Sequence, residues 1–477
     1  MERWQDPEWV KTMNIRLDYS RMTADFIGLE HGITNDEIDS LVPRATQVAG
    51  DINKRRKSGE YGFYQLPYDL VTAGNVVETA KALRKNCDNL VLIGIGGSAL
   101  GAAALFRSLC HPLHNLLTKK ERVGIPRFFV IDNVDPATCR AVFNQIDPMK
   151  TIFNIVTKAG TTTETVSQFL IARQLISGTL GKKAVKDHIV VTTDNRPNPL
   201  RKIAEAAGYT ILDIPENVGG RFSVFSPVGI FPAAVLGIDI EELLAGAWLA
   251  DKRCRTAELR RNPAYMAGAL HYLADTRKGL HITAMMPYSD ALYQIAFWFR
   301  QLWAESLGKS LDRDGNFVHS GQTPVAALGA TDQHSQLQLY MEGPFNKMIT
   351  FLIVENHNTE LKIPAVVEDD FSYLKKRELG DLLNIEAQST QMGLARAGRS
   401  YLRLILPEVN PFTIGQLLFM LEVQTVFTGG LYNINPLDQP GVVASKEYIY
   451  GLLGHENYRG KAEEIRAQQK QNGLYVI

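Results

Sequence analysis

Short apolar segments alternate with helical patterns from residue 89 onward, and this alternation limits the possible folds more than any other feature. The strand-like segments of the first half are 90–95, 127–132, 151–157 and 188–193. Helical patterns lie between and after them at 136–146, 164–176 and 199–208. A second set contains strand-like segments at 280–286 and 346–354 and a long helix from about 290 to 306. Such alternation predicts an α/β protein with two doubly wound parallel sheets.

The composition indicates a soluble globular protein with a large core. Apolar residues make up 45% of the 477 residues and charged residues 21%, which is typical of globular domains. The 51 basic residues equal the 51 acidic ones, so no charge excess indicates a nucleic-acid or membrane partner. The four cysteines, which form neither a zinc nor a disulfide pattern, predict reduced thiols and a cytoplasmic protein.

The chain is expected to divide into four parts. A helical arm at 1–45 precedes a first sandwich domain at 46–245, a second at 246–455, and a helical tail at 456–477. The charged N-terminal stretch lacks the apolar core of a signal peptide. The apolar stretch 222–238 contains two prolines and is shorter than the ~20 residues of a membrane helix, so we expect it to be buried core. No low-complexity linker separates the two halves, which predicts that they pack closely.

The stretch IGIGGSALG, residues 93–101, combines the end of a strand, a glycine-rich turn and the start of a helix. This arrangement favours an anion at the helix N-terminus. Gly94, Gly96 and Ala99 fit the dinucleotide pattern G-x-G-x-x-A, but the acidic residue that the pattern requires about 20 positions later is missing, and Asp132 comes too late. The triphosphate pattern needs a lysine after the last glycine, and none is present.

A phosphate monoester fits the sequence better than either nucleotide. Gly97 allows close approach of the backbone and Ser98 adds a hydroxyl at the helix start. A second strand–turn–helix unit offers Thr157, Lys158, Thr161 and Thr162. The alternative is helix capping, because Thr161 and Glu164 have the spacing of a capping box. Capping accounts for one hydroxyl but not for four polar groups around a glycine.

Two further residues are candidates for chemistry. Arg221 follows two glycines inside an apolar stretch, where a guanidinium needs a bound anion or a buried ion pair. Glu305 shares a helix face with Gln294 and Gln301. Aromatic neighbours would disfavour its ionised form and tune it as a base that removes a proton from carbon. The alternative is a solvated glutamate in the last turn of the helix.

His334, in the polar stretch 329–344, and Lys446, after a Gly-containing turn, complete the candidate set. Taken alone, each is more typical of a structural or solvated residue. No metal-binding pattern such as H-E-x-x-H accompanies them, which disfavours a metal-assisted hydride shift.

From about residue 60 to 455 the chain resembles the glucose-6-phosphate isomerase family, in its bacterial size class. The resemblance is carried by GIGGSALG, TKAGTTTET, VGGRFSVFSPVG, ESLGK, DQHS and LDQPGVVASK, which occur in the family's order. It implies two sugar-isomerase (SIS) sandwich domains and a homodimer whose active site lies between domains and subunits. It also implies an isomerase, formally an intramolecular oxidoreductase, that interconverts glucose 6-phosphate and fructose 6-phosphate through a cis-enediolate without a metal or cofactor.

The resemblance also implies roles for the candidate residues. Gly97, Ser98, Thr157, Lys158, Thr161 and Thr162 would hold the phosphate, and Gln301 and Gln439 would line the sugar site. Glu305 would move the proton between C2 and C1, and Arg221 would stabilise the enediolate. His334, from the partner subunit, and Lys446 would open the sugar ring. Our own hypothesis adds that Glu164 orients His334.

Three positions depart from the family pattern. Ala159 stands where a hydroxyl residue is common, which affects the phosphate loop, and Leu437 and Val443 replace a phenylalanine and a glutamate near Lys446. Two alternative functions stay open at this point. One is isomerisation or epimerisation of another phosphosugar, such as mannose 6-phosphate, and the other is a sugar-phosphate sensor without catalysis.

Overall fold

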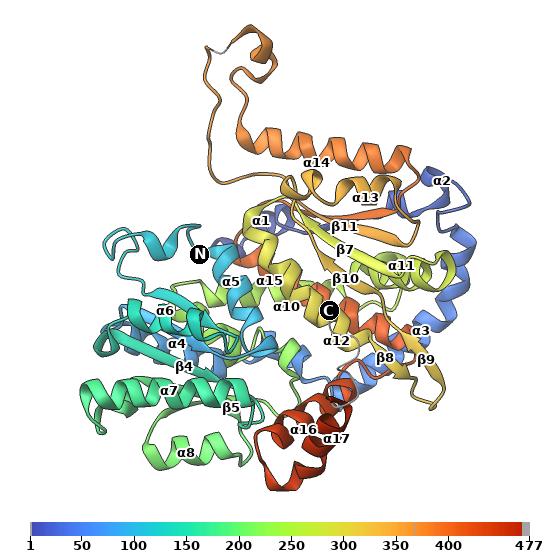
Figure 1. Cartoon of the computed structure of the whole chain (residues 1–477). Coiled ribbons are helices and arrows are strands. Elements are labelled where there is room, and N and C mark those ends of the chain that lie inside the picture. The colour runs from blue at the N-terminus through green and yellow to red at the C-terminus, as the bar shows by residue number, and fades with distance from the viewer. Residues whose placement is uncertain (1, 367, 470–477) are drawn as a thin grey trace.

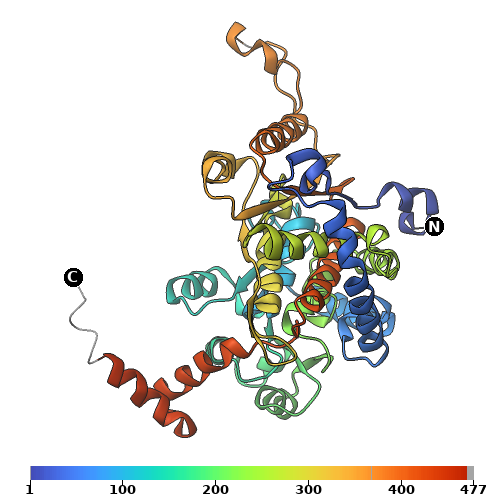
Figure 2. The same ribbon diagram turned by 90° about the vertical axis from the view of Figure 1, so that its right-hand side faces the viewer.

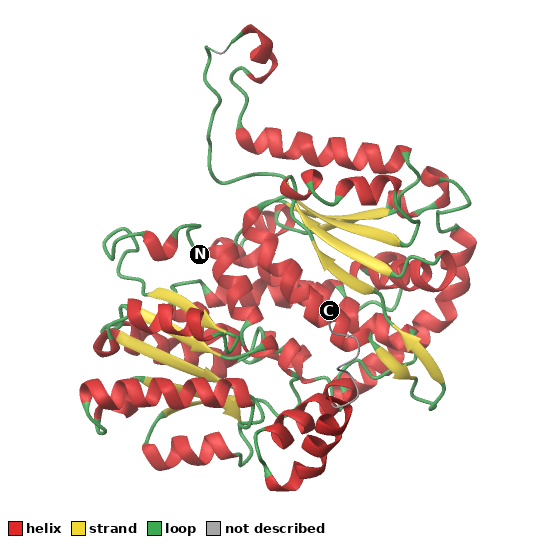
Figure 3. Cartoon of the chain, in the orientation of Figure 1, coloured by secondary structure: helices red, strands yellow, loops and turns green. Residues whose placement is uncertain are grey.

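Two five-stranded sheets, each with helices on both faces, form the framework of the chain (Figures 1 and 3). The computed structural model describes residues 2–366 and 368–469. The first sheet has the order β3-β2-β4-β5-β6, and all its pairings are parallel. Its strands are β2 (Asn89–Ile93), β3 (Arg127–Ile131), β4 (Thr151–Val156), β5 (Ile189–Asp194) and β6 (Thr210–Ile214).

Strand β2 shows why this sheet is covered on both sides. Successive side chains of a strand point to opposite faces, and Leu90 and Leu92 belong to one buried cluster while Val91 and Ile93 belong to another. The outer face packs on α6 (Pro136–Gln145), α7 (Thr163–Leu180) and α8 (Pro199–Ala207). The inner face packs on α4 (Leu70–Arg84), α5 (Leu100–Leu109) and α9 (Pro227–Val235). Continuous apolar strands of this kind are typical of buried parallel sheets.

The second sheet has the order β1-β12-β11-β7-β10. Its strands are β1 (Arg16–Asp18), β7 (Ile282–Pro287), β10 (Thr323–Ala326), β11 (Lys347–Val354) and β12 (Tyr401–Leu406). The pairings are parallel except that β1, from the N-terminal arm, pairs antiparallel with β12. Helices α13 (Leu337–Glu342) and α14 (Leu379–Arg396) cover its outer face.

Between the sheets lies a shared core built around α15 (Pro411–Leu431). This helix packs against α3 (Asn35–Lys57), α10 (Ile240–Arg253), α11 (Pro263–Lys278) and α12 (Tyr293–Leu307). It is long and apolar enough to cross a membrane, yet 94% of its most apolar window is buried inside the protein. It is therefore the central core helix of both halves.

Two segments project from the body of the molecule. Residues 355–366 and 368–378, between β11 and α14, extend at the top of Figure 1 and expose Leu361, Phe371 and Tyr373. The helices α16 (Val443–Leu452) and α17 (Arg459–Gln469) extend away from the sheets (Figure 2), and α16 exposes Val443 and Leu452. The remaining elements are α1 (Pro7–Thr12), α2 (Ala24–Ile27), β8 (Lys309–Leu311) and β9 (Phe317–Ser320).

The predicted α/β class, the two sheets and the long helices are confirmed, and α9 is buried core as expected. The sequence did not predict β1, β6, β10 and β12 of the two sheets, nor the separate β8–β9 pair. The expected part boundaries after residues 45 and 245 fall inside α3 and α10. The four-part division itself stays a prediction, and residues 470–477 of the expected helical tail lie outside the described residues.

Candidate active site

The first predicted anion-binding turn follows β2 at the carboxyl edge of the first sheet. A 3-10 turn spans Gly96–Ser98, and α5 begins at Leu100, after the single residue Ala99. Gly96 has a φ of +59°, a left-handed conformation that favours glycine. Among the described residues no side chain caps the start of α5. Its first N–H groups, the turn and the Ser98 hydroxyl therefore suit a phosphate.

The second turn, residues 157–162, lies next to the first because β4 is the neighbour of β2. Thr162 is the N-cap residue of α7, but its hydroxyl oxygen lies 2.8 Å from that of Thr157 and caps no backbone group. The alternative interpretation, a capping box of Thr161 and Glu164, is not found, because the N-cap residue is Thr162 and it makes no side-chain cap. Like those of α5, the first backbone N–H groups of α7 have no side-chain cap among the described residues, so they can bind an anion instead.

Both turns contact residues 216–220, the segment that precedes Arg221. Lys158 Nζ donates to the carbonyl oxygens of Glu216 at 2.6 Å and Val218 at 2.8 Å, and burial lowers the pKa of this lysine. A Cβ on Gly97 would lie 2.3 Å from the carbonyl oxygen of Gly220. Only a glycine allows this approach of the two backbones, which fixes the first turn against the base of Arg221.

Arg221 is buried, with only 4% of its surface exposed. Its donors reach Ser306 Oγ at 2.7 Å, Gln439 Oε1 at 3.1 Å, Pro436 O at 2.6 Å and Asp438 O at 3.0 Å. Burial lowers the pKa of the guanidinium. Because most of its acceptors are uncharged, this buried cation remains available to attract a developing negative charge.

Glu305 lies beside Arg221, in the last turn of α12. Its Oε1 is 3.5 Å from Arg221 Nη1, and its Oε2 accepts a hydrogen bond of 2.9 Å from Gln301 Nε2. A Cβ on Gly96 would lie 2.8 Å from the same Gln301 nitrogen. The carboxylate, the guanidinium and the first turn are therefore neighbours, and a quarter of the Glu305 side chain (26%) is exposed.

The expected aromatic surroundings of Glu305 are not found. Trp303 is fully buried and packs against Phe299 and His271, on a different face of α12. The neighbours of the carboxylate are an amide and a guanidinium. The prediction that aromatic side chains surround Glu305 is therefore wrong, although Glu305 itself lies in the site.

Sequence reasoning missed Lys309, the first residue after the Gly308 that ends α12. Lys309 Nζ is buried and donates to the carbonyl oxygens of Glu305 and Ser306, each at 2.8 Å. It also lies 3.7 Å from Asp438 Oδ1. Lys309 thus connects the last turn of α12 to the loop 436–439, which accepts three hydrogen bonds from Arg221. A lysine just beyond a helix C-terminus, within ESLGK, was the signal that could have found it.

We expect the Lys309→Met variant to lower kcat about 10-fold, or ~1.4 kcal/mol in the barrier, and to remove a pH effect. Burial and the Arg221 charge lower the pKa of Lys309 from 10.5 to about 8. Wild-type kcat should then fall as pH rises through about 8, because the amine loses its charge and one donor. The kcat–pH profile of both proteins tests this.

Lys309→Arg is the matched control for this prediction. Its guanidinium keeps its charge at all assay pH values. In this variant the fall of kcat should therefore shift to higher pH, while KM stays similar. If kcat fell equally above pH 8 in the wild type and in Lys309→Met, Lys309 would have only a structural role.

Within one chain, His334 and Lys446 do not lie with Arg221 and Glu305. His334 ends a short 3-10 turn, Thr331–His334, and is exposed; Lys446 is exposed on α16. Within residues 2–366 and 368–469, no hydrogen bond joins either of them to Glu305, or His334 to Glu164. The hydroxyl of Tyr450, one turn beyond Lys446, donates to Thr161 O at 3.2 Å, which places α16 next to the second turn.

The three departures from the family pattern lie around the site. Ala159 is exposed in the second turn. Leu437 packs against the shared core, and Val443 is 52% exposed at the start of α16. None of them alters a contact of Arg221 or Glu305 described above.

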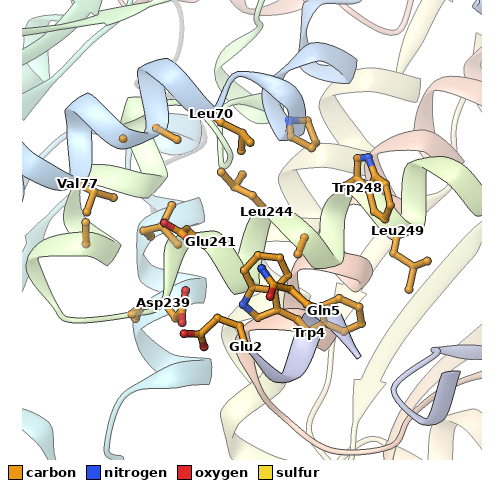
Figure 4. Close-up of a pocket in the computed structure, with 18 of the residues that line it drawn as sticks. Glu2, Trp4, Gln5, Leu70, Val77, Asp239, Glu241, Leu244, Trp248 and Leu249 are labelled. Atoms are coloured by element: carbon orange, nitrogen blue, oxygen red, sulfur yellow. The ribbon is translucent and has the colours of Figure 1, made fainter. Parts of the chain in front are cut away.

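A cavity of about 1100 Å³ lies elsewhere, between the N-terminal segment, α4 and α10 (Figure 4). Leu70, Leu244 and Trp248 line it, and none of the candidate residues does. Across the part of the chain that the structure describes, no three His, Cys, Asp or Glu side chains gather as metal ligands.

Comparisons with known proteins agree on one family. The family model described as phosphoglucose isomerase matches residues 68–457. A protein named glucose-6-phosphate isomerase from Carboxydothermus hydrogenoformans is 40% identical over 462 residues, covering 96% of this chain and 99% of its own. One of the same name from Rubrobacter xylanophilus is 41% identical and covers 94% of this chain and 99% of its own.

Solved structures are similar over most of the chain as well. A hypothetical protein from Thermus thermophilus has a TM-score of 0.81 and 35% identity, covering 92% of this chain and 100% of its own. A glucose-6-phosphate isomerase from Chlamydia trachomatis has a TM-score of 0.72 and 23% identity, over 83% of this chain and 76% of its own. At that identity the second match supports the fold alone.

Proposed function

The chain belongs to the phosphoglucose isomerase family, and on this premise we propose that it interconverts glucose 6-phosphate and fructose 6-phosphate, a step of glycolysis and gluconeogenesis. The observation that carries this proposal is the Glu305 carboxylate 3.5 Å from the buried guanidinium of Arg221. A base, a cation for developing charge and two phosphate-binding turns thus lie in one place, which is the set that an aldose–ketose isomerisation needs.

The two turns anchor the phosphate in this proposal. Gly97 and Ser98 offer backbone N–H groups and a hydroxyl at the start of α5. Thr157, Lys158, Thr161 and Thr162 supply hydroxyls and one cation on the neighbouring turn. Binding energy from the phosphate then orients the reacting carbons over Glu305, and Gln301 and Gln439 line the sugar beside it.

The reaction itself is a proton transfer. His334 and Lys446 open the pyranose by moving a proton to the ring oxygen. Glu305 then removes the C2 proton of the aldehyde, which leaves a cis-enediolate whose negative oxygen faces Arg221. The Glu305 carboxyl returns that proton to C1 and gives the ketose. Every step uses side chains of this protein and the sugar, so the proposal includes no cofactor and no metal ion.

We further propose a homodimer whose partner supplies His334 to this site. Two features support it. His334 is exposed and lies apart from Glu305 within one chain. The projecting residues 355–366 and 368–378 and helix α14 expose apolar side chains, among them Phe371, Tyr373 and Ile385, and exposed apolar surface is typical of contact sites.

Hybrid dimers test the shared site. We expect His334→Ala and Glu305→Gln to be inactive separately and to regain about a quarter of wild-type activity when unfolded together and refolded as a mixture. Half of the dimers would be hybrids, and each hybrid would have one intact site. Sedimentation velocity must show dimers in all samples. A mixture as inactive as its components would contradict a shared site.

We propose a cytoplasmic location, in line with the phosphorylated substrate. All four cysteines, Cys87, Cys110, Cys139 and Cys254, are free in the structure. Free thiols in a chain of this size are typical of reducing compartments.

Fructose 6-phosphate in heavy water with EDTA tests the function directly. We expect proton NMR to show glucose 6-phosphate with deuterium at C2, because the enediolate is reprotonated by a base that exchanges with solvent. Mannose 6-phosphate as the main product would move the assignment to another phosphosugar isomerase. Binding without exchange or product would indicate a sensor.

A further inference from the structure

The second sheet repeats the strand sequence that creates the first site. In the first sheet the chain passes from β2 to β3 on one side and then to β4 on the other. In the second it passes from β7 to β10 on one side and then to β11 on the other. In sheets of this kind, ligands bind outside the carboxyl ends of the strands at the point where the direction reverses. The two phosphate turns lie at this point of the first sheet.

A cavity of about 520 Å³ lies at the corresponding point of the second sheet. Its lining comes from residues 289–291 after β7, 356–359 after β11 and 408–411 after β12, and residues 107–110 at the end of α5 close one side. The volume is in the range of small-molecule sites. This cavity is separate from the one in Figure 4.

The lining is rich in groups that bind hydroxyls. It contains the carboxylates of Asp290 and Glu408, the carboxamides of Asn356 and Asn358 and the imidazole of His357. His357 Nε2 is buried and has no hydrogen-bond partner among the described residues. A buried polar atom without a partner costs ~1–3 kcal/mol, and a turn of the His357 ring toward the cavity, where a ligand hydroxyl would pair with Nε2, would remove that cost.

The charges of this cavity disfavour a phosphate. Asp290 stands near the start of α12, where the first site has Ser98. The two arginines of the lining already have partners: Arg3 bonds Glu242 at 2.8 Å and lies 4.0 Å from Glu408 Oε1, and Arg107 donates to Pro112 O at 3.5 Å. Carboxylates form strong, charge-assisted hydrogen bonds with hydroxyl donors.

We propose that this cavity is a second ligand site, for an uncharged polyhydroxy compound of about hexose size. The site is connected to the first through two helices. Residues 289–291 lead into α12, whose last turn carries Glu305, and Ser108 Oγ of α5 donates to Ala291 O at 2.7 Å.

Saturation-transfer NMR on the full chain, with D-sorbitol as probe, tests the proposal. We expect signal transfer to sorbitol in the wild type and binding weakened about 10-fold in His357→Ala and in Asn356→Leu, where hydroxyl partners are lost. Isomerase activity should be unchanged in both variants. Lys158→Ala, a change in the first site, should leave sorbitol binding intact and weaken fructose 6-phosphate binding.

Three results would overturn the proposal. The first is no transfer to sorbitol in the wild type. The second is equal transfer in the wild type and in both cavity variants. The third is loss of transfer in Lys158→Ala with retention in His357→Ala, which would place the polyol in the first site. Because the isomerase assay is run on the same samples, a failure of the proposed function would be seen separately.

Discussion

Replacement of Glu305 by glutamine should lower kcat by about 10²–10⁴-fold, the usual contribution of a positioned base. Glutamine has nearly the same shape, and its amide oxygen can still accept the bond that Gln301 Nε2 gives at 2.9 Å. The variant should therefore fold normally and bind fructose 6-phosphate within a few-fold of the wild type. It should also lose deuterium exchange at C2. Stopped assays and proton NMR in heavy water measure both effects.

The chain offers a matched control for this variant. Glu342 also ends a helix and accepts a hydrogen bond from the glutamine four residues earlier, Gln338, at 2.7 Å. Glu342→Gln changes the same chemical group in the same local setting but outside the candidate site, so it should retain full activity. Substantial turnover by Glu305→Gln, or equal losses in both variants, would exclude Glu305 as the base.

Arg221→Met should have the second largest effect, with kcat reduced about 10²–10³-fold through loss of charge stabilisation in the transition state. The substitution also leaves Pro436 O and Asp438 O without the donors that reach them at 2.6 and 3.0 Å. Each unpaired buried acceptor costs ~1–3 kcal/mol. The unfolding midpoint should therefore fall together with kcat.

Arg221→Lys separates these two effects. Lysine keeps the charge near Glu305 but cannot reach all the acceptors of the planar guanidinium. It should lose stability as Arg221→Met does while retaining more of kcat, when both are assayed at a temperature where each is folded. If kcat in the two variants simply followed their stability, Arg221 would be a structural residue.

The sequence predicted the fold well where the period of the apolar residues was clear. In β2 every residue from Asn89 to Ile93 is buried, and a short buried run that ends at a glycine turn is typical of a central parallel strand. Two of the strands that it missed, β1 and β10, are too short for a period to be clear. β1 has only three residues, Arg16–Asp18, and depends on β12, which lies almost 400 positions away in the chain.

The site was predicted in part. Gly97, Arg221 and Glu305 were each identified locally, and the structure brings them together. The contacts that join Lys309 and Arg221 to the loop at 435–439 could not be found in this way, because no local pattern encodes the pairing of distant segments. Contacts with a second chain, which we propose for His334, are also beyond any local pattern.

The position of α15 in the chain has a consequence for biosynthesis. Residues 411–431 are made after both sheets, yet the helices on the inner faces of the sheets pack against them. Neither half can complete its core while the ribosome is still translating the preceding 410 residues. Since nascent domains with incomplete cores expose apolar surface and aggregate, this chain should depend on chaperones during synthesis and fold in a single late step.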